Sequence, residues 1–167
     1  MLICSKYDDA KHRNFVYKAY LTSQRAASGA SAATDRQYYD VEEPLLERLL
    51  AHPTTVCLVA THPEEDDLYY GVIIGRHGRG QQSACIDFVY TKKALRGYGV
   101  ARGLYQELRK IIGPPLYASH YPHVGWQRKR WPELGLKYNM YSRLNVCLEG
   151  ILEHKYGEQN WELVEVK

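Results

Sequence analysis

The sequence predicts a mixed α/β (α+β) domain, and three features carry this prediction. Between residues 84 and 112 an apolar strand pattern runs through a glycine-rich turn into an amphipathic helix. Strand patterns at 54–60 and 68–76 flank an acidic turn and predict a hairpin. Two helical patterns precede that hairpin. At 167 residues the chain lies in the single-domain range, so we expect one domain over residues 1–167.

The N-terminal part predicts a strand followed by a helix and a loop. Residues 2–7 favour a short strand, and Asp8 and Asp9 offer caps for a helix that ends near Thr22. The small residues of 26–34 have little to bury, so they predict a mobile loop.

The second helix is expected to begin near Asp40. Glu43 follows three positions later, as in a capping box, and Pro44 then falls in the first turn.

The central strand and helix meet in the most informative part of the chain. The strand that starts at Ala84 is rich in apolar, β-branched and aromatic side chains, which favours burial of most of its surface. From Val100 the apolar positions repeat with a helical period, through Leu104 and Leu108. Gly113 and the two prolines after it end that helix.

Beyond this helix we expect a fifth strand at 116–120, a helix at 123–134 and a further strand at 137–144. The tail, residues 145–167, is either a C-terminal extension or supplies the last strand of a hairpin.

The turn between the central strand and helix predicts an anion site. Two glycines permit backbone conformations and close approaches that side chains would forbid. The unpaired amides at the start of the helix, together with the helix dipole, favour a negative charge, and Arg96 adds a permanent cation. Neither the GxGxxG dinucleotide fingerprint nor the GxxxxGK phosphate loop is present.

What the turn matches is R-x-x-G-x-A, formed by Arg96, Gly99 and Ala101. With a strand before it and an amphipathic helix after it, the segment resembles the GCN5-related N-acetyltransferase (GNAT) superfamily, and the whole chain resembles the small phage and bacterial members. The resemblance implies acetyl-coenzyme A (acetyl-CoA) as acyl donor. The alternative is a plain strand-to-helix connection in another α/β domain.

The resemblance also implies a fold and a binding mode. The fold is a mostly antiparallel central sheet, whose parallel strands 4 and 5 splay apart, flanked by about four helices. The turn would hold the pyrophosphate, the strand before it would pair with the pantetheine arm, and the amide of Val89 or Tyr90 would polarise the thioester carbonyl. The expected cofactor-binding residues are Phe88, Val89, Tyr90, Thr91, Arg96, Gly97, Tyr98, Gly99, Val100 and Ala101.

The residues that handle protons are marked less clearly. Many members of the superfamily carry an acid tyrosine in a stretch resembling YEKLGF, whereas the matching segment here begins with Trp131, whose indole cannot usefully protonate a thiolate. Tyr138 and Tyr121 are therefore candidate acids. His120 is the candidate base, because an ordinary histidine pKa of about 6.5 suits proton transfer at neutral pH. Other bases stay open, namely Asp87 or a water chain that ends on Asp40, Glu42 or Glu43.

Composition narrows the class of protein. The chain lacks a nucleophile signature and a metal-ligand spacing among its histidines, so we expect neither a covalent intermediate nor a metal. Four widely separated cysteines, no signal-peptide core and no long apolar run predict a cytoplasmic protein that does not span a membrane.

Nucleic acid is a less favoured partner. The net charge of +3 is too mild to imply it. Residues 126–131 place three cations between two tryptophans, a pattern that could pair phosphates with stacked bases. A helix with solvated cations is the simpler interpretation.

The sequence thus predicts transfer of an acetyl group from acetyl-CoA to a primary amine of a small molecule or protein, by direct attack in a ternary complex. Two alternatives remain, a catalytically silent binding module of the same fold and a nucleic-acid-modifying relative. The oligomeric state does not follow from the sequence, and a homodimer is compatible with it.

Overall fold

The computed structural model describes residues 2–28, 34–65, 67–78, 84–115, 117–119 and 137–138. The helix expected at 123–134, most of the strand expected at 137–144 and the tail at 145–167 lie outside these ranges.

The described strands form one sheet, and their order in space follows their order in the chain. Each successive pair among the first four strands is antiparallel. The fifth strand runs parallel to the fourth, and the sixth runs parallel to the fifth. Their bounds are β1 Ile3–Lys6, β2 Thr55–Thr61, β3 Tyr69–Arg76, β4 Cys85–Thr91, β5 Tyr117–Ala118 and β6 Lys137–Tyr138. The predicted mixed, mostly antiparallel sheet with parallel β4 and β5 is confirmed.

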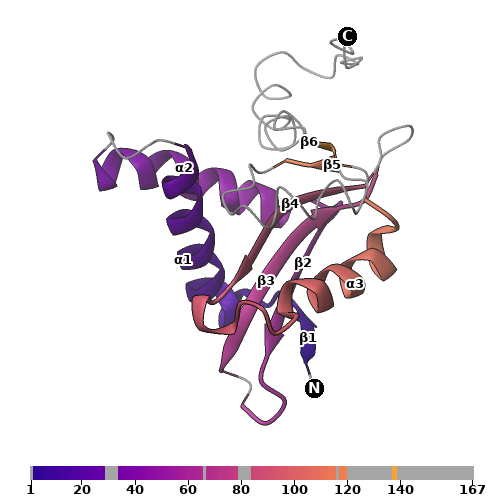
Figure 1. Cartoon of the computed structure of the whole chain (residues 1–167). Helices are drawn as coiled ribbons and strands as arrows, with labels where there is room; N and C mark the ends of the chain where they lie inside the picture. The colour runs from indigo at the N-terminus through magenta and orange to yellow at the C-terminus, as the bar shows by residue number, and fades with distance from the viewer. Residues whose placement is uncertain are drawn as a thin grey trace.

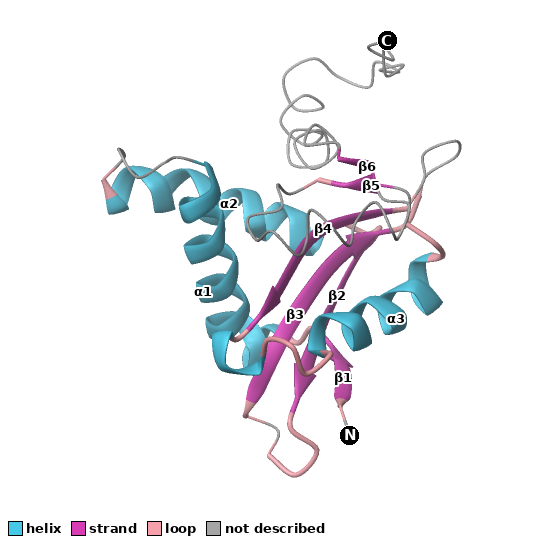
Figure 2. Cartoon of the chain, in the orientation of Figure 1, coloured by secondary structure: helices cyan, strands magenta, loops and turns pink. Residues whose placement is uncertain are grey.

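Helices cover both faces of this sheet (Figure 1). Two of them, α1 (Asp9–Ser28) and α2 (Asp35–Ala51), lie on one face, and α3 (Val100–Ile112) lies on the other, as the secondary-structure colouring of Figure 2 also shows. A short 3₁₀ turn, η2 (Lys93–Leu95), joins β4 to the segment before α3. The fourth helix expected from the sequence falls at 123–134, outside the described residues.

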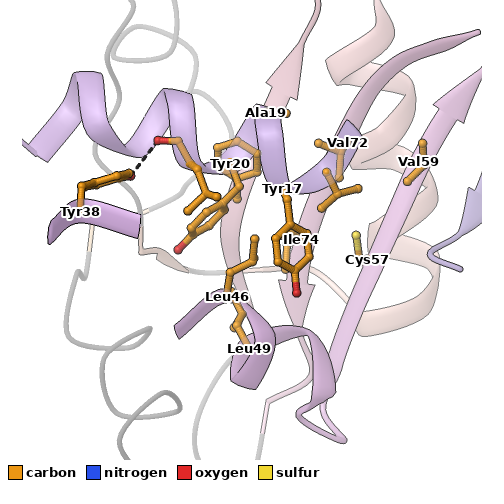
Figure 3. Close-up of a cluster of buried hydrophobic side chains, with 13 residues drawn as sticks. Tyr17, Ala19, Tyr20, Tyr38, Leu46, Leu49, Cys57, Val59, Val72 and Ile74 are labelled. Carbon is orange, nitrogen blue, oxygen red and sulfur yellow. Dashed lines mark hydrogen bonds between the residues drawn. The ribbon is translucent and has the colours of Figure 1, made fainter. Parts of the chain in front are cut away.

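The core on the α1 and α2 face is rich in tyrosine (Figure 3). Tyr17, Tyr20 and Tyr38 are buried there with Leu46 and Leu49 of α2. A buried tyrosine needs a partner for its hydroxyl, and the Tyr38 hydroxyl donates to the backbone carbonyl of Leu21 at 2.7 Å. These tyrosines therefore belong to the packing of the helices on the sheet.

The start of α2 corrects one expectation. The predicted start near Asp40 was wrong, because the helix begins at Asp35, and Thr34 is its N-cap. The Thr34 hydroxyl accepts from the Gln37 amide at 3.3 Å, and the Gln37 side chain accepts from the Thr34 amide at 3.0 Å. This is a capping box of the predicted kind, but it lies earlier in the chain. Pro44 consequently lies inside the helix.

The end of α1 corrects a second. The run at 26–34 does not begin with a loop, because α1 continues to Ser28. Alanine is the strongest helix former, so Ala26 and Ala27 extend the helix at no cost in propensity. An ion pair between Arg25 and Asp35 joins the end of α1 to the start of α2.

The close packing of α3 on β3 positions the turn predicted to bind an anion. Gly71 and Gly75 of β3 lie under α3, and a Cβ atom on Gly75 would come 2.7 Å from Cδ2 of Leu108. Because these positions lack side chains, the helix can rest directly on the strand backbone. Val100, at the first turn of α3, is buried in the same core.

Candidate functional site

The turn before α3 has the backbone that its glycines predict. Gly97 and Gly99 have φ angles of 92° and 84°, in the left-handed region that side chains disfavour. A Cβ atom at either position would meet no other atom within 4 Å. The turn is therefore open, and the volume that side chains would occupy there is free for a ligand.

The N-terminus of α3 presents backbone amides to this open volume. Gly99 is the N-cap and supplies no side-chain acceptor. The first amides of a helix have no intrahelical partner, and the helix dipole is positive at this end. An anion above Gly99, Val100 and Ala101 would accept hydrogen bonds from these amides and would be attracted by the positive end of the dipole.

Three cations shortly precede the turn in the chain. Arg96 and Lys93 are exposed, and Lys92 is half-buried with its ammonium 5.6 Å from the ring centre of Phe15. Arg96 also approaches the end of β4, with its Nε 3.5 Å from the carbonyl oxygen of Thr91. Tyr98, between the two glycines, is 82% exposed. The positive charge of Arg96 therefore lies directly before the turn that would bind a phosphate group.

Strand β4 has one paired edge and one open edge. On one side it pairs with β3 as far as Thr91. On the other side β5 pairs with Cys85 and Ile86 alone, and Ser119 then donates its amide to the Ile86 carbonyl at 2.8 Å. Within the described ranges, no strand pairs with 87–91 on the β5 side, and we call this stretch the open edge of β4. The splay that the resemblance implied concerns the chain after Ser119, which lies outside the described residues, and it stays a prediction.

The hydrogen-bond pattern shows which groups of β4 face the open edge. Lys92 donates its amide to the Tyr70 carbonyl of β3 at 2.9 Å. The backbone amides and carbonyls that face β3 therefore recur at every second residue, at Tyr90 and Phe88. The amide and carbonyl of Val89 and Thr91 therefore point to the open edge. Of the two amides proposed to polarise a thioester, Val89 has the suitable direction.

The predicted cofactor-binding side chains of β4 differ in their exposure. Phe88 is 2% exposed and stacks edge-on against Tyr20, with ring centres 5.0 Å apart, on the α1 and α2 face. Val89, Tyr90 and Thr91 are half-buried. The end of β4 is therefore the part that a ligand can reach.

Of the three predicted catalytic residues, the structure describes only the backbone of Tyr138. His120 and Tyr121 are outside the described residues, as is the basic segment 126–131. The backbone of Tyr138 lies in β6, where it pairs with Ala118 of β5. The roles of all three stay predictions.

Asp87 occupies a different environment from that of a catalytic base. Its side chain is fully buried, and each carboxylate oxygen accepts a hydrogen bond from Arg76, at 2.5 Å from Nε and 2.8 Å from Nη2. The Ser119 hydroxyl donates to Oδ1 at 2.5 Å. A carboxylate that is fully buried and paired with an arginine is not exposed to a substrate amine.

Sequence reasoning missed Arg76 and Ser119. One signal for Arg76 was present, because a lone acid in an apolar strand needs a buried partner. Arg76 is the charged residue that ends the neighbouring strand β3. Ser119 gave no such signal.

The three acidic residues of α2 named as possible ends of a water chain differ in their surroundings. Asp40 is exposed and lies 3.7 Å from Arg36. Glu43 lies 4.0 Å from Arg13 of α1. Glu42 is half-buried. A water chain from any of them to the site stays a prediction.

The described residues offer neither a metal site nor a membrane span. These residues contain no group of three or more histidine, cysteine, aspartate or glutamate side chains that could hold a metal ion. None of the helices in the described part of the chain is both long and apolar enough to cross a membrane.

Comparison with known proteins identifies the fold. The sequence matches no protein-family model and no curated protein sequence. The structure resembles a putative acetyltransferase from Pyrococcus furiosus, with a TM-score of 0.61 and 15% identity over 83% of this chain and 95% of that one. For a putative acetyltransferase from Bacillus subtilis the TM-score is 0.61 and the identity 19%, over 83% and 94% of the two chains.

A third solved structure is the aminoglycoside N-acetyltransferase AAC(6')-Iy in complex with CoA. It has a TM-score of 0.52 and 13% identity, over 81% of this chain and 91% of that one. The class that fold and site define is an α+β domain in which parallel strands β4 and β5 lie beside an open glycine turn. This is the GNAT fold, as the resemblance in the sequence implied.

Proposed function

We propose that this protein is an N-acetyltransferase that uses acetyl-CoA. The observation that carries the proposal is the junction of β4 and α3. There the N-terminus of α3, which has no side-chain cap, and two left-handed glycines face open space. The open edge of β4 lies beside them. The amides of Gly97, Gly99, Val100 and Ala101 would hold the pyrophosphate, whereas the Tyr98 amide donates to the Leu95 carbonyl within the turn. Arg96 would be a neighbouring cation.

The open edge of β4 suits the pantetheine arm. The outward amide and carbonyl of Thr91 can pair with the amide groups of the arm, as an added strand would. The Val89 amide, directed the same way, would donate to the thioester oxygen and stabilise the negative charge that develops there. Both roles use the backbone, so they do not depend on which side chains occupy these positions.

Acetyl-CoA supplies a thioester whose acetyl group passes to the amine as the carbon–sulfur bond breaks. The protein must first remove a proton from the acceptor ammonium, because only the neutral amine has the lone pair that attacks the thioester carbon, and must then supply a proton to the departing thiolate. We propose His120 for the first step and Tyr121 or Tyr138 for the second. The acceptor is proposed to be a primary amine, which the neighbours' acetylation of an aminoglycoside and of a ribosomal-protein alanine supports.

Calorimetry with acetyl-CoA and with CoA tests the binding step. We expect saturable binding of both at one site per chain, and no binding would contradict the proposal. Thiol release measured against a panel of polyamines, aminoglycosides and peptide amines tests the transfer step. Binding without thiol release from any amine would instead favour the catalytically silent module, an alternative that the tryptophan at position 131 supports.

A further inference from the structure

A buried polar cluster lies next to the residues through which β4 pairs with β5. Arg76 of β3, Asp87 of β4 and Ser119, directly after β5, are 6%, 0% and 4% exposed. Asp87 accepts two hydrogen bonds from Arg76 and one from the Ser119 hydroxyl. The Cys85 thiol lies 3.8 Å from the same carboxylate. The cluster thus joins three consecutive strands of the sheet through one side chain.

Stability alone does not account for this cluster. Removing two charges from water costs several kcal/mol for each ion, and a buried ion pair returns about that amount when its geometry is good. Apolar side chains of similar volume would stabilise the sheet equally well. What a charged, bidentate pair adds is a defined geometry, because its hydrogen bonds are directional.

Asp87 is also the extra residue of a β-bulge. Ile74 pairs with Phe88 and Gly75 pairs with Ile86, so Asp87 has no partner of its own on β3. A bulge shifts the alternation of the strand by one residue. Ile86 therefore packs on the α3 face, whereas Phe88, two residues later, packs on the opposite face.

The same shift decides which amides face the open edge. The Ile86 carbonyl points to β5, where it accepts from Ser119. If Asp87 were instead paired regularly with a residue of β3, strict alternation from Ile86 would direct the amides of Phe88 and Tyr90 to that edge and turn Val89 toward β3. The bulge at Asp87 is therefore the feature that directs the Val89 amide outward.

Ser119 connects this bulge to β5. Its amide donates to the Ile86 carbonyl and its hydroxyl donates to the Asp87 carboxylate. Both contacts lie next to the pair of Ile86 with Ala118. Ser119 therefore connects the end of β5 to the bulge in β4.

We propose that Arg76, Asp87 and Ser119 form a positioning cluster that fixes the bulge in β4 and its connection to β5, and so directs the Val89 amide at the thioester. The inference depends on the proposed acetyl transfer. None of the three residues touches the substrate in this account; they act through the backbone of β4.

Ser119→Ala is the test variant, because it removes one hydrogen bond and leaves the ion pair in place. Tyr38→Phe is the matched control. It too removes one buried hydroxyl that donates a hydrogen bond, here to the Leu21 carbonyl, at a site on the helices away from β4 and β5.

The first measurement is amide hydrogen exchange of the free protein by NMR, which needs no cofactor. We expect Ser119→Ala to accelerate exchange at Phe88 and at residue 119 by about 10- to 100-fold relative to Val59 of β2, the effect of losing a hydrogen bond to a charged group. Tyr38→Phe should leave those ratios unchanged. Unchanged ratios in Ser119→Ala would overturn the inference, whether or not acetyl-CoA binds.

The second measurement separates binding from turnover. With the best acceptor amine, we expect Ser119→Ala to lower kcat by about 10- to 100-fold, because a small displacement of the Val89 amide weakens transition-state stabilisation. The Kd for CoA should change less than about twofold, since the turn at 97–101 lies at the N-terminus of α3, outside the cluster.

The remaining outcomes each decide one question. A kcat equal to that of Tyr38→Phe, with accelerated exchange, would make the cluster purely structural and overturn the inference while the proposed function stands. Absence of acetyl-CoA binding by the wild type would overturn the proposed function, and the catalytic part of the inference with it.

Discussion

Gly75 of β3 lies directly beneath Leu108 of α3, so close that a Cβ atom on the glycine would come 2.7 Å from the leucine Cδ2. The same Cβ would lie 3.0 Å from the Cys85 carbonyl oxygen. The helix that carries the anion turn therefore rests on a strand position where only glycine fits.

We predict that Gly75→Ala destabilises the protein by about 1–3 kcal/mol, the usual cost of overpacking a core. The measurement is urea unfolding followed by circular dichroism. Because Leu108 provides the nearest atom, the double variant with Leu108→Val should be less destabilised than the sum of the single variants. Strict additivity would show that the two side chains do not meet.

Gly97→Val should abolish CoA binding, with Gly113→Val as the control. Both glycines have positive φ angles, 92° and 81°, and open surroundings, so either substitution should cost about 1–2 kcal/mol of stability through backbone strain. Only Gly97 lies in the turn, so calorimetry should show a loss of affinity of about 100-fold or more for Gly97→Val alone. An equal loss in both variants would place the anion elsewhere.

Asp87→Asn should destabilise the fold by about 3–5 kcal/mol, because it leaves the buried Arg76 guanidinium without its counter-ion. Lys110→Gln, which breaks the exposed pair with Glu107, should cost less than about 1 kcal/mol. Thermal and urea unfolding measure both. Asp87→Asn with wild-type stability would contradict the buried ion pair.

Stability should also fall in mild acid because of His12. Burial lowers the pKa of this histidine below its ordinary value, an effect that Lys11 increases and Asp8 opposes. The unfolded chain therefore binds a proton that the folded chain resists, so the stabilisation is complete above about pH 6.5 and decreases as the pH falls below it.

His12→Gln is the corresponding variant. The His12 Nδ1 accepts a hydrogen bond from the Asp8 amide at 2.9 Å, and a glutamine oxygen can accept the same bond without titrating. Unfolding midpoints at pH 7.5 and pH 5.5 should differ less in His12→Gln than in the wild type. An identical difference would assign the acid sensitivity to other groups.

Local sequence patterns predicted most of the elements correctly. The run from Ala84 through Val100 to Gly113 carried a strand, a glycine turn and a helix, and β4 and α3 have close to those bounds. The errors fell at the ends of α1 and α2, where Thr34 and Gln37 form the capping box instead of the residues expected. Several residues there could cap a helix, and the ion pair of Arg25 with Asp35, absent from any local pattern, lies at the true boundary.

The sequence by itself determined the strand, turn and helix that make the anion site, because amphipathic periods and glycine conformations depend on neighbouring residues in the chain. Only the tertiary structure decided that Asp87 is a buried carboxylate with hydrogen bonds from Arg76 and Ser119, and that the Val89 amide faces the open edge of β4. Both depend on residues far apart in the chain, Arg76 and Ser119, and on the strand register that places a bulge at Asp87. Register is a property of two strands together, so no single stretch of sequence contains it.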